Sequence, residues 1–282
     1  MSISEKKGIG QGGNLKLILG IVLVAVVAGA GYYAYQATQT PQVQPTTAVS
    51  TPTTRQTQPT TQVTTTRTAS IIVKWLGHSS FMIKAAGKTI YTDPYVGEYV
   101  DKADLILVSH SHSDHMNTTY INKVRRDDTV IIAPADCAAK IGGTIKSLKP
   151  GEKTTVGEIV VEAVEAYNFK RFRSPGNPYH PKGFGVGYLL TIGGKIIYHA
   201  GDTDFIDEMK TLKGIHLALL PSGGTYTMDN PEVVEATLAI KPKFLIPMHR
   251  WDTDPSSIKK EVEAKPDTKV LLLKPGEQFE IE

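Results

Sequence analysis

Three histidines and one aspartate fall within six consecutive residues, His110-Ser111-His112-Ser113-Asp114-His115. Imidazole nitrogens and carboxylate oxygens are the ligands that a divalent cation such as zinc selects. The run just before the motif, residues 105–109, is apolar and predicts a buried strand. The motif therefore lies where a strand runs out into a loop, which is where open sheets present functional groups. A chain with this feature has to fold so that distant segments converge on a cation.

The spacing of the motif indicates two metal ions. Residues two apart in an extended chain share a face, so His110 and His112 can hold one ion together. Asp114 and His115 follow as the chain turns and can face a second ion beside the first. The alternative interpretation is a polar loop in which histidines cluster by chance.

Composition sets wide limits on the rest of the chain. The formal net charge of +3 over 282 residues does not indicate nucleic acid, and no nucleic-acid partner is expected. A hydrophobic content of 40% permits an ordinary core. The single cysteine, Cys137, excludes an internal disulfide framework. It follows Asp136, which is expected to cap a short helix, and it is predicted to be a buried, unreactive thiol.

Residues 17–35 are uncharged and almost wholly apolar, with the length of a membrane-spanning helix. Basic residues precede this stretch, and no Lys or Arg follows until Arg55. The positive-inside rule then predicts a cytoplasmic segment over 1–16 and an external remainder. The sequence thus predicts a single-pass protein of the cell membrane with its folded domain outside.

A cleaved signal peptide is the alternative for this stretch, with Ala28-Gly29-Ala30 as a small-residue cleavage site. Either interpretation exports the same domain. Residues 36–69 are rich in Thr, Gln and Pro and contain no aromatic residue, so we expect a disordered tether.

Residues 70–282 remain and fit one domain of the α/β (α+β) class. Apolar and alternating runs predict strands at 71–75, 81–84, 89–92, 105–109, 129–133, 158–167, 188–192, 195–199, 217–221, 244–247 and 270–273. Helical patterns lie at 118–125, 204–212, 231–240 and 255–264. Strands first, then two rounds of β/α alternation, predict two sheets packed face to face with helices outside.

Three alternate glycines, Gly183, Gly185 and Gly187, lead into one of these strands. They lack the strand–loop–helix setting and the Lys-Ser/Thr ending of a phosphate-binding loop. We interpret them as positions where backbones approach closely.

The chain resembles the metallo-β-lactamase superfamily, whose signature matches the motif at 110–115. Gly201-Asp202-Thr203 resembles its bridging aspartate, and Pro247-Met248-His249 resembles its final histidine. Gly77-His78-Ser79-Ser80 and Thr92-Asp93-Pro94 resemble the branch with sugar-phosphate lactonases and uncharacterised metal-dependent hydrolases. The resemblance covers nearly all of 71–282 and implies a four-layer αββα sandwich with the site along one edge of the sheets.

The resemblance also implies roles for individual residues. His110 and His112 would bind a first ion, and Asp114, His115 and His249 a second, with Asp202 bridging the two. The cofactor would be one or two divalent metal ions, zinc first and manganese or iron as alternatives. A metal-bound hydroxide would be the nucleophile. The catalytic residues would then be Asp202 and Asp114, which would orient that hydroxide and move a proton.

One departure from the superfamily concerns the first ion. Members usually supply a further histidine at the end of a middle strand, where this chain has Asn168. We hypothesise that His180, in a proline-flanked loop, reaches the first ion or binds substrate instead. An exposed loop histidine and a one-metal site are the alternatives. We expect His78, Asp93 and Asn168 to orient the ligands from behind.

The loop 168–182 carries basic side chains and no acid, so it predicts a cationic rim beside the metal ions. Such a rim would attract anionic substrates. The predicted substrate-binding residues are Lys170, Arg171, Arg173, Lys182 and Arg250. A solvated loop, or one that faces anionic lipid, is the alternative.

The predicted function is therefore a membrane-anchored, metal-dependent hydrolase acting on an anionic ester, lactone or phosphodiester of small size. A nuclease-type member of the superfamily is one alternative, although there is no room after His115 for the large inserted domain of RNA-processing relatives. A non-catalytic module that captures metal or an anion is the other. The sequence does not indicate an oligomeric state.

Overall fold

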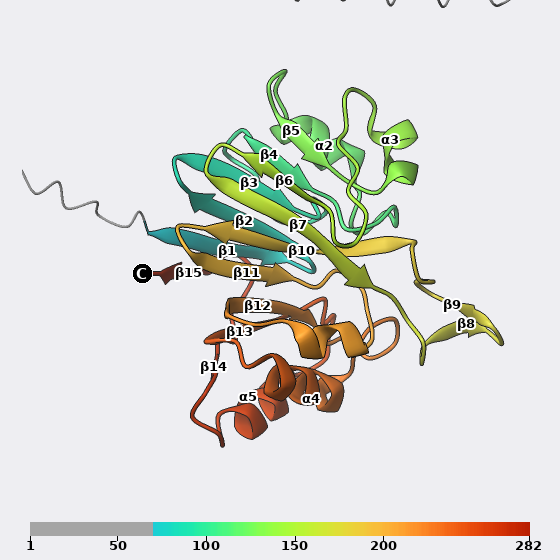
Figure 1. Cartoon of the computed structure of the whole chain (residues 1–282), viewed down its shortest axis with the longest axis vertical. Coiled ribbons are helices and arrows are strands. Elements are labelled where there is room, and N and C mark those ends of the chain that lie inside the picture. Colours follow the sequence, from blue (N-terminus) through green and yellow to red (C-terminus); the bar gives the residue numbers. More distant parts are fainter. Residues whose placement is uncertain (1–69) are drawn as a thin grey trace, which may run out of the picture. The chain divides into compact units, whose positions relative to one another are not determined.

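The computed structural model describes residues 70–282, which form two β-sheets with helices on their outer faces (Figure 1). The predicted cytoplasmic segment, membrane anchor and tether, residues 1–69, lie outside the described residues. Within residues 70–282, no helix combines the length and the apolar character needed to cross a membrane.

The first sheet has six strands in the order β15-β1-β2-β3-β4-β5. Strands β1 to β3 form an antiparallel meander, whereas β3, β4 and β5 run parallel. Their bounds are β1 (Ile71–Gly77), β2 (Ser80–Ala85), β3 (Lys88–Thr92), β4 (Leu105–Leu107), β5 (Val130–Ile132) and β15 (Gln278–Ile281). Successive side chains of a strand point to opposite faces. In β4, accordingly, Leu105 and Leu107 enter the core between the sheets while Ile106 faces the helices.

The second sheet has seven strands in the order β14-β13-β12-β11-β10-β7-β6. Its bounds are β6 (Lys153–Val156), β7 (Ile159–Ala166), β10 (Gly185–Ile192), β11 (Lys195–His199), β12 (Ile215–Pro221), β13 (Phe244–Met248) and β14 (Lys269–Val270). The predicted hairpin joins β10 to β11, and Gly193 and Gly194 supply the positive φ that its two-residue turn requires. A separate pair, β8 (Phe172–Ser174) and β9 (Asn177–Pro178), projects from the segment between β7 and β10.

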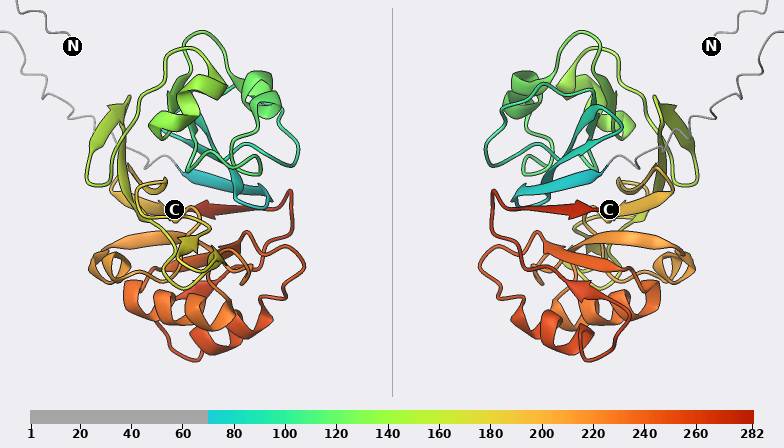
Figure 2. Two further views of the ribbon diagram at one scale, coloured as in Figure 1. Left: turned by 90° about the vertical axis from the view of Figure 1, so that its right-hand side faces the viewer. Right: turned by 90° about the vertical axis from the view of Figure 1, so that its left-hand side faces the viewer.

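The two sheets and the helices outside them form four layers (Figure 2). Three clusters of buried apolar side chains fill the spaces between these layers. The largest takes side chains from both sheets and fills the space between them. The others pack the second sheet against α4, α5 and η1, and the first sheet against α2 and α3. The helices are α2 (Thr118–Val124), α3 (Ala135–Ile141), η1 (Asp207–Thr211), α4 (Asn230–Ile240) and α5 (Ser256–Val262). Each large apolar side chain buried here contributes roughly 1.5–3 kcal/mol, and the layer order agrees with the predicted sandwich.

The helix predicted over 204–212 is wrong in extent, because only the short 3₁₀ helix η1 forms there. Asp204 is engaged elsewhere: its carboxylate accepts hydrogen bonds from the backbone N–H groups of Phe169 and Lys170. The strands β6, β8, β9 and β15 have no counterpart among the predicted elements. β8 and β9 are largely exposed and include Pro178, so they show no apolar alternation that could have indicated strands.

The helix predicted near Cys137 forms, but its capping residue differs from the prediction. α3 begins at Ala135 with Pro134 at the N-cap, so Asp136 lies in the first turn and caps nothing. Cys137 is buried, and burial raises the pKa of its thiol to about 12, which agrees with the predicted unreactive role.

Strand direction explains where functional residues gather. β1, β3 and β4 share one direction, and so do β7, β11 and β13 in the second sheet. Their carboxyl ends therefore meet along one edge of each sheet. Gly185 brings the two edges together: a Cβ at this position would lie 3.0 Å from His110 Cβ, so glycine allows β10 to pass close to the motif.

Candidate metal centre

The predicted site residues converge at this edge, each at or soon after the end of a strand. In the first sheet His78 follows β1, Asp93 follows β3 and the motif 110–115 follows β4; in the second, Asp202 follows β11 and His249 follows β13. His180 arrives from the segment that also carries β8 and β9.

Three histidines form a first group, in which ring nitrogens face one another. His112 Nδ1 lies 3.0 Å from His110 Nε2 and 3.1 Å from His180 Nε2. One ligand atom from each of the three falls within 4.8 Å of the others. His180 is only 3% exposed, so it is not a solvent-exposed loop histidine. The structure thus brings a third nitrogen to the place where the sequence lacks the superfamily histidine.

Asp114, His115 and His249 form a second group, and His78 lies with them. His78 Nε2 is 3.5 Å from Asp114 Oδ2, and neither ring nitrogen of His78 makes a hydrogen bond. From the sequence we expected His78 to orient the metal ligands without being one of them. The structure instead places its ring among the possible ligands themselves.

Asp202 lies between the two groups. Its Oδ2 is 3.3 Å from His180 Nε2 and 3.1 Å from His249 Nε2, and its Oδ1 is 3.4 Å from His115 Nε2. Despite these distances, Oδ1 of Asp202 and Nε2 of His115 and His249 are buried without a hydrogen bond. Buried polar atoms normally have a partner. A divalent cation fits, because it binds imidazole nitrogens and carboxylate oxygens that converge in this way.

Asp93 fixes the orientation of two histidines in the cluster. Its Oδ2 accepts from His115 Nδ1 at 2.8 Å, which turns His115 Nε2 toward Asp202. The same carboxylate accepts from Ser109 Oγ at 2.7 Å. Because the Ser109 hydroxyl donates to Asp93, it is left to accept from His110 Nδ1, 3.0 Å away. Asp93 therefore holds both rings from behind, as such partners of metal ligands do.

Asn168 fixes His180 in the same way. Its Nδ2 donates to Asp204 Oδ1 at 3.0 Å, so its Oδ1 is the acceptor that faces His180. That oxygen accepts from the backbone N–H of His180 at 3.0 Å and from His180 Nδ1 at 2.7 Å. The free Nε2 then points at His112 and Asp202. The asparagine that stands at this position therefore orients His180.

Burial decides the protonation of the first group. It lowers the pKa of His110 well below its usual value, with nearby His115 acting in the same direction, and it lowers the pKa of His180 to about 4. Both rings are therefore neutral at pH 7, which is the form that binds metal.

His115 and Asp202 form an ion pair instead. Burial opposes both charges, but Asp202 and Asp93 raise the pKa of His115 well above its usual value. In turn His115 and His249 hold the pKa of the Asp202 carboxyl well below its usual range. A bound cation would replace the proton on His115, because metal binding requires the free ring nitrogen.

Backbone strain accompanies this arrangement. His78, Asp93 and His249 have φ values of 52°, 40° and 46°, which are uncommon for residues other than glycine. Each such conformation costs on the order of 1–3 kcal/mol and persists where the surroundings fix it, as at functional sites.

The predicted cationic rim is largely absent. Arg171 is half-buried among acids from other elements: its Nη1 lies 2.6 Å from Asp204 Oδ1, and its Nη2 pairs with Glu232. Its Nε donates to Gly224 O at 2.8 Å. These contacts tie the loop to the domain. Burial lowers the pKa of Arg171, but Glu232 and Asp204 raise it by more, so the guanidinium stays charged. Arg171 does not face the metal ligands.

Three other predicted cations also have partners away from the site. Lys170 Nζ lies 2.7 Å from Glu232 Oε1, Lys182 Nζ lies 2.8 Å from Glu208 Oε1, and Arg250 Nη2 donates to Leu273 O at 2.6 Å. The loop contains no acid, as its sequence shows, but α4 and η1 bring acids to it. Of the five predicted substrate-binding residues, only Arg173 lines the pocket over the metal ligands.

That pocket has a volume of about 550 Å³ and opens directly over both groups. It is lined by His112, Ser113, Asp114, Arg173, Tyr179, His180, Asp202, Tyr226, His249 and Trp251. Sequence reasoning missed three aromatic residues of this wall. Trp251 stands two residues after His249 and could have been found from that position, whereas Tyr179 and Tyr226 carry no such signal.

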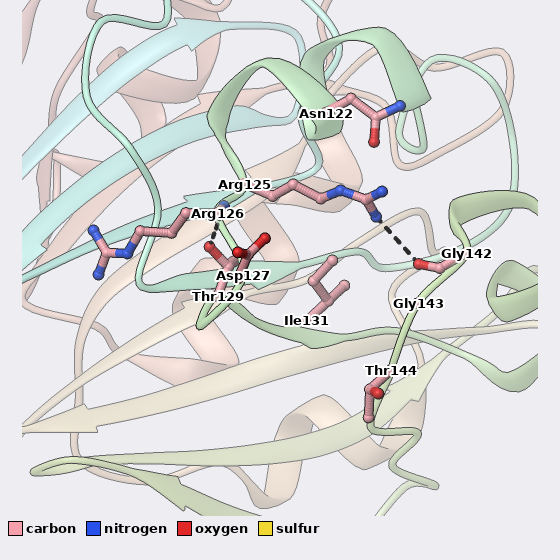
Figure 3. A pocket seen from close by; sticks show the side chains of 9 residues that line it. All are labelled: Asn122, Arg125, Arg126, Asp127, Thr129, Ile131, Gly142, Gly143 and Thr144. Atoms are coloured by element: carbon pink, nitrogen blue, oxygen red, sulfur yellow. Dashed lines mark hydrogen bonds between the residues drawn. The ribbon is translucent and has the colours of Figure 1, made fainter.

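A second pocket, of about 490 Å³, lies between α2, β5 and the turn after α3 (Figure 3). Arg125 crosses it and donates to Gly142 O at 3.2 Å. It shares no residue with the pocket over the metal ligands and contains no histidine. None of the metal-ligand candidates lines this second pocket.

Comparison with known proteins agrees with this geometry. Residues 72–249 match the model of the beta-lactamase superfamily domain. A protein of Pelotomaculum thermopropionicum named UPF0173 metal-dependent hydrolase is 32% identical over 228 residues, which are 74% of this chain and 99% of that protein. A protein of Methanosarcina mazei with the same name is 31% identical over 232 residues, 76% of this chain and 100% of that protein.

Solved structures give the same result. A protein from Parabacteroides distasonis shares 35% identity with a TM-score of 0.67 and covers 72% of this chain and 93% of its own. A metallo hydrolase from the archaeon Ignicoccus hospitalis shares 25% identity with a TM-score of 0.64, covering 76% and 99%. The chain therefore belongs to the beta-lactamase superfamily, and its relatives there are named metal-dependent hydrolases.

Proposed function

We propose that this protein is a metal-dependent hydrolase that cleaves an ester, lactone or phosphodiester bond in a small anionic molecule. The observation that carries the proposal is the Asp202 carboxylate, whose oxygens lie within 3.4 Å of ring nitrogens from both histidine groups. A bridging carboxylate suits two cations held side by side, since it offsets their mutual repulsion.

His110, His112 and His180 would hold a first ion. Asp114, His115 and His249, with His78 beside them, would hold a second, and Asp202 lies where it could serve both. Zinc is the cation that this nitrogen-rich donor set suits best, and manganese or iron are the alternatives. When bound, such ions lower the pKa of coordinated water toward neutrality and so supply a nucleophile at pH 7.

The chain's own residues supply positioning and proton transfer. Asp93 and Asn168 hold the rings of His115 and His180 with their Nε2 atoms toward the centre. Asp114 lines the pocket, and its half-exposed carboxylate is placed to take a proton from water and return it to the leaving group. The other buried groups of the cluster are shielded from water, which strengthens their electrostatic effect on the reacting atoms.

The proposal is tested by metal analysis together with hydrolysis assays. We expect up to two equivalents of metal per chain, and metal-dependent turnover of bis-p-nitrophenyl phosphate or of at least one lactone in a panel. Dialysis against a chelator should abolish turnover, and zinc, manganese or iron should restore it. Bound metal without hydrolysis of any substrate would instead favour a module that captures metal or an anion.

Membrane location remains a prediction from residues 17–35, together with the tether over 36–69. Fractionation of cells that express the full chain would test it. Recovery in the soluble fraction with residue 1 intact would contradict an uncleaved anchor.

A further inference from the structure

The wall of the metal pocket contains one cation without an acidic partner. Arg173 is exposed, lines the pocket, and forms no salt bridge with any acid in residues 70–282. The other basic residues of its loop are paired, Lys170 and Arg171 with Glu232 and Lys182 with Glu208. The wall therefore presents a single positive charge to a ligand, and not the broad cationic rim that a molecule with several negative charges requires.

Aromatic rings make up much of the remaining wall. Tyr179 and Tyr226 meet edge to face with centroids 4.8 Å apart, and Arg173 Cζ lies 5.6 Å from the Tyr179 ring centre. Trp251 lines the same pocket, is 55% exposed and meets the His78 ring edge to face at 4.8 Å. Exposed aromatic rings next to the buried metal-ligand candidates offer apolar surface. An apolar or aromatic group that packs on this surface is stabilised because it removes the surface from water.

Backbone contacts fix the segments that carry these rings before any ligand binds. Tyr179 N donates to Arg171 O at 3.2 Å, and the Tyr226 carbonyl accepts from Asn168 Nδ2 at 3.1 Å. Gly223 allows the turn that bears Trp251 to approach, because a Cβ at position 223 would lie 2.5 Å from His249 O. A preformed wall loses little conformational freedom on binding, which favours affinity.

We propose that this pocket selects substrates that combine a flat aromatic group with a single negative charge close to the scissile bond. This inference rests on the proposed function and narrows its substrate class. The aromatic group packs against the rings that line the pocket, Trp251, Tyr179 and Tyr226, and the anionic group accepts hydrogen bonds from the Arg173 guanidinium.

The test measures binding and not turnover, with the full, metal-loaded chain in a titration calorimeter. The probes are naphthalene-2-carboxylate, its neutral carboxamide, and cyclohexanecarboxylate, which keeps the charge but is not flat. The variants are Arg173→Gln, Trp251→Ala and the control Lys182→Gln, which removes a cation of the same loop that is paired outside the pocket. Metal content of each variant verifies that the centre is intact.

We expect the parent to bind the naphthalene carboxylate at least tenfold more tightly than either other probe. Arg173→Gln should weaken that carboxylate about tenfold, as loss of a charge-assisted hydrogen bond does, and leave the carboxamide unchanged. Trp251→Ala should weaken both naphthalene probes and spare cyclohexanecarboxylate. Lys182→Gln should change no affinity by more than about twofold, since an exposed ion pair contributes little.

The inference is overturned if the naphthalene carboxylate does not bind, if cyclohexanecarboxylate binds equally well, or if Arg173→Gln has no effect because the metal ions alone hold the carboxylate. These outcomes differ from failure of the proposed function. A protein that binds aromatic anions selectively but hydrolyses nothing contradicts the enzyme and leaves the selectivity of the pocket standing.

Discussion

The strand ends that carry the metal-ligand candidates differ from the basic loop 168–182 in what their side chains contact. The candidates contact one another, whereas the basic side chains contact acids from other elements. The candidates in the motif are close in sequence, and Asp202 and His249 reach the same edge because each follows a strand that ends there. The basic side chains of the loop depend on acids that α4 and η1 supply. The spacing of ligand-type residues in the sequence was enough to predict where they gather. The positive charge of the loop was not enough to predict which groups its side chains contact.

The largest expected effect tests the first half of this comparison. Asp202→Ala removes the only carboxylate among the described residues that contacts both histidine groups, so we expect hydrolysis to fall by roughly 10³-fold or more. Metal content should fall with it. Asp207→Ala, an exposed aspartate on η1, is the matched control and should behave like the parent. Full activity of Asp202→Ala would remove the bridging role.

His180→Ala tests whether the loop contributes a metal ligand as well as charges. We expect loss of about one metal equivalent per chain and a fall in activity of roughly 10²-fold, because even partners behind the ligands typically cost about 10–100-fold. His216→Ala is the control, since His216 lies in β12 and its Nδ1 contacts only the backbone of Gly214 and Ile196 among the described residues. Metal analysis showing unchanged occupancy would exclude His180 as a ligand.

Asp93→Asn should have a smaller effect, because it leaves every ligand in place. The amide keeps the shape of the side chain and tolerates the positive φ at this position. It removes the negative charge that holds His115 and, through Ser109, His110. We expect metal affinity or activity to fall about 10–100-fold, measured by competition with a chelator. Affinity equal to that of Asp101→Asn, a surface control, would contradict this orienting role.

The fold and the core of the site were largely predictable, since both follow from local pattern. Alternation and apolar runs located every strand of the two sheets except the edge strands β6 and β15, and the ends of the predicted strands carry most ligand candidates. The function of His180 was open because it depends on Asn168 and Asp204, which lie in other segments. The rim was mispredicted for the same reason: no local pattern showed that Glu232 would reach Arg171. Tyr226 joined the wall only through tertiary packing.

Glu232→Gln sharpens the second half of the comparison and should leave the metal centre intact. Burial raises the pKa of the Glu232 carboxyl, but Arg171 and Lys170 together hold it below its usual value. A lowered carboxyl pKa contributes stability above the unfolded value of about 4.3, and that stability is lost as pH falls through the folded value. We expect a loss of about 1–3 kcal/mol at pH 7.

Thermal unfolding of Glu232→Gln and its parent, followed from pH 7 down to pH 3, checks this expectation. The difference between them should shrink as the parent carboxyl becomes protonated. Glu235→Gln, an exposed acid on the same helix, is the control and should differ little from the parent at any pH. A difference that stays constant down to pH 3 would show that the carboxylate does not hold the loop through its charge.

The segment between β7 and β10 supplies His180 to the metal centre and Arg173 and Tyr179 to the pocket wall, and Arg171 fixes it to the domain. Binding of metal and binding of a molecule in the pocket would thus depend on the same segment. Thermodynamic reciprocity then requires that an occupant which raises the affinity for metal through this segment is itself bound more tightly by the metal-loaded protein, and by the same factor. A substitution in this segment is therefore expected to change the affinity for metal and the affinity for substrate together.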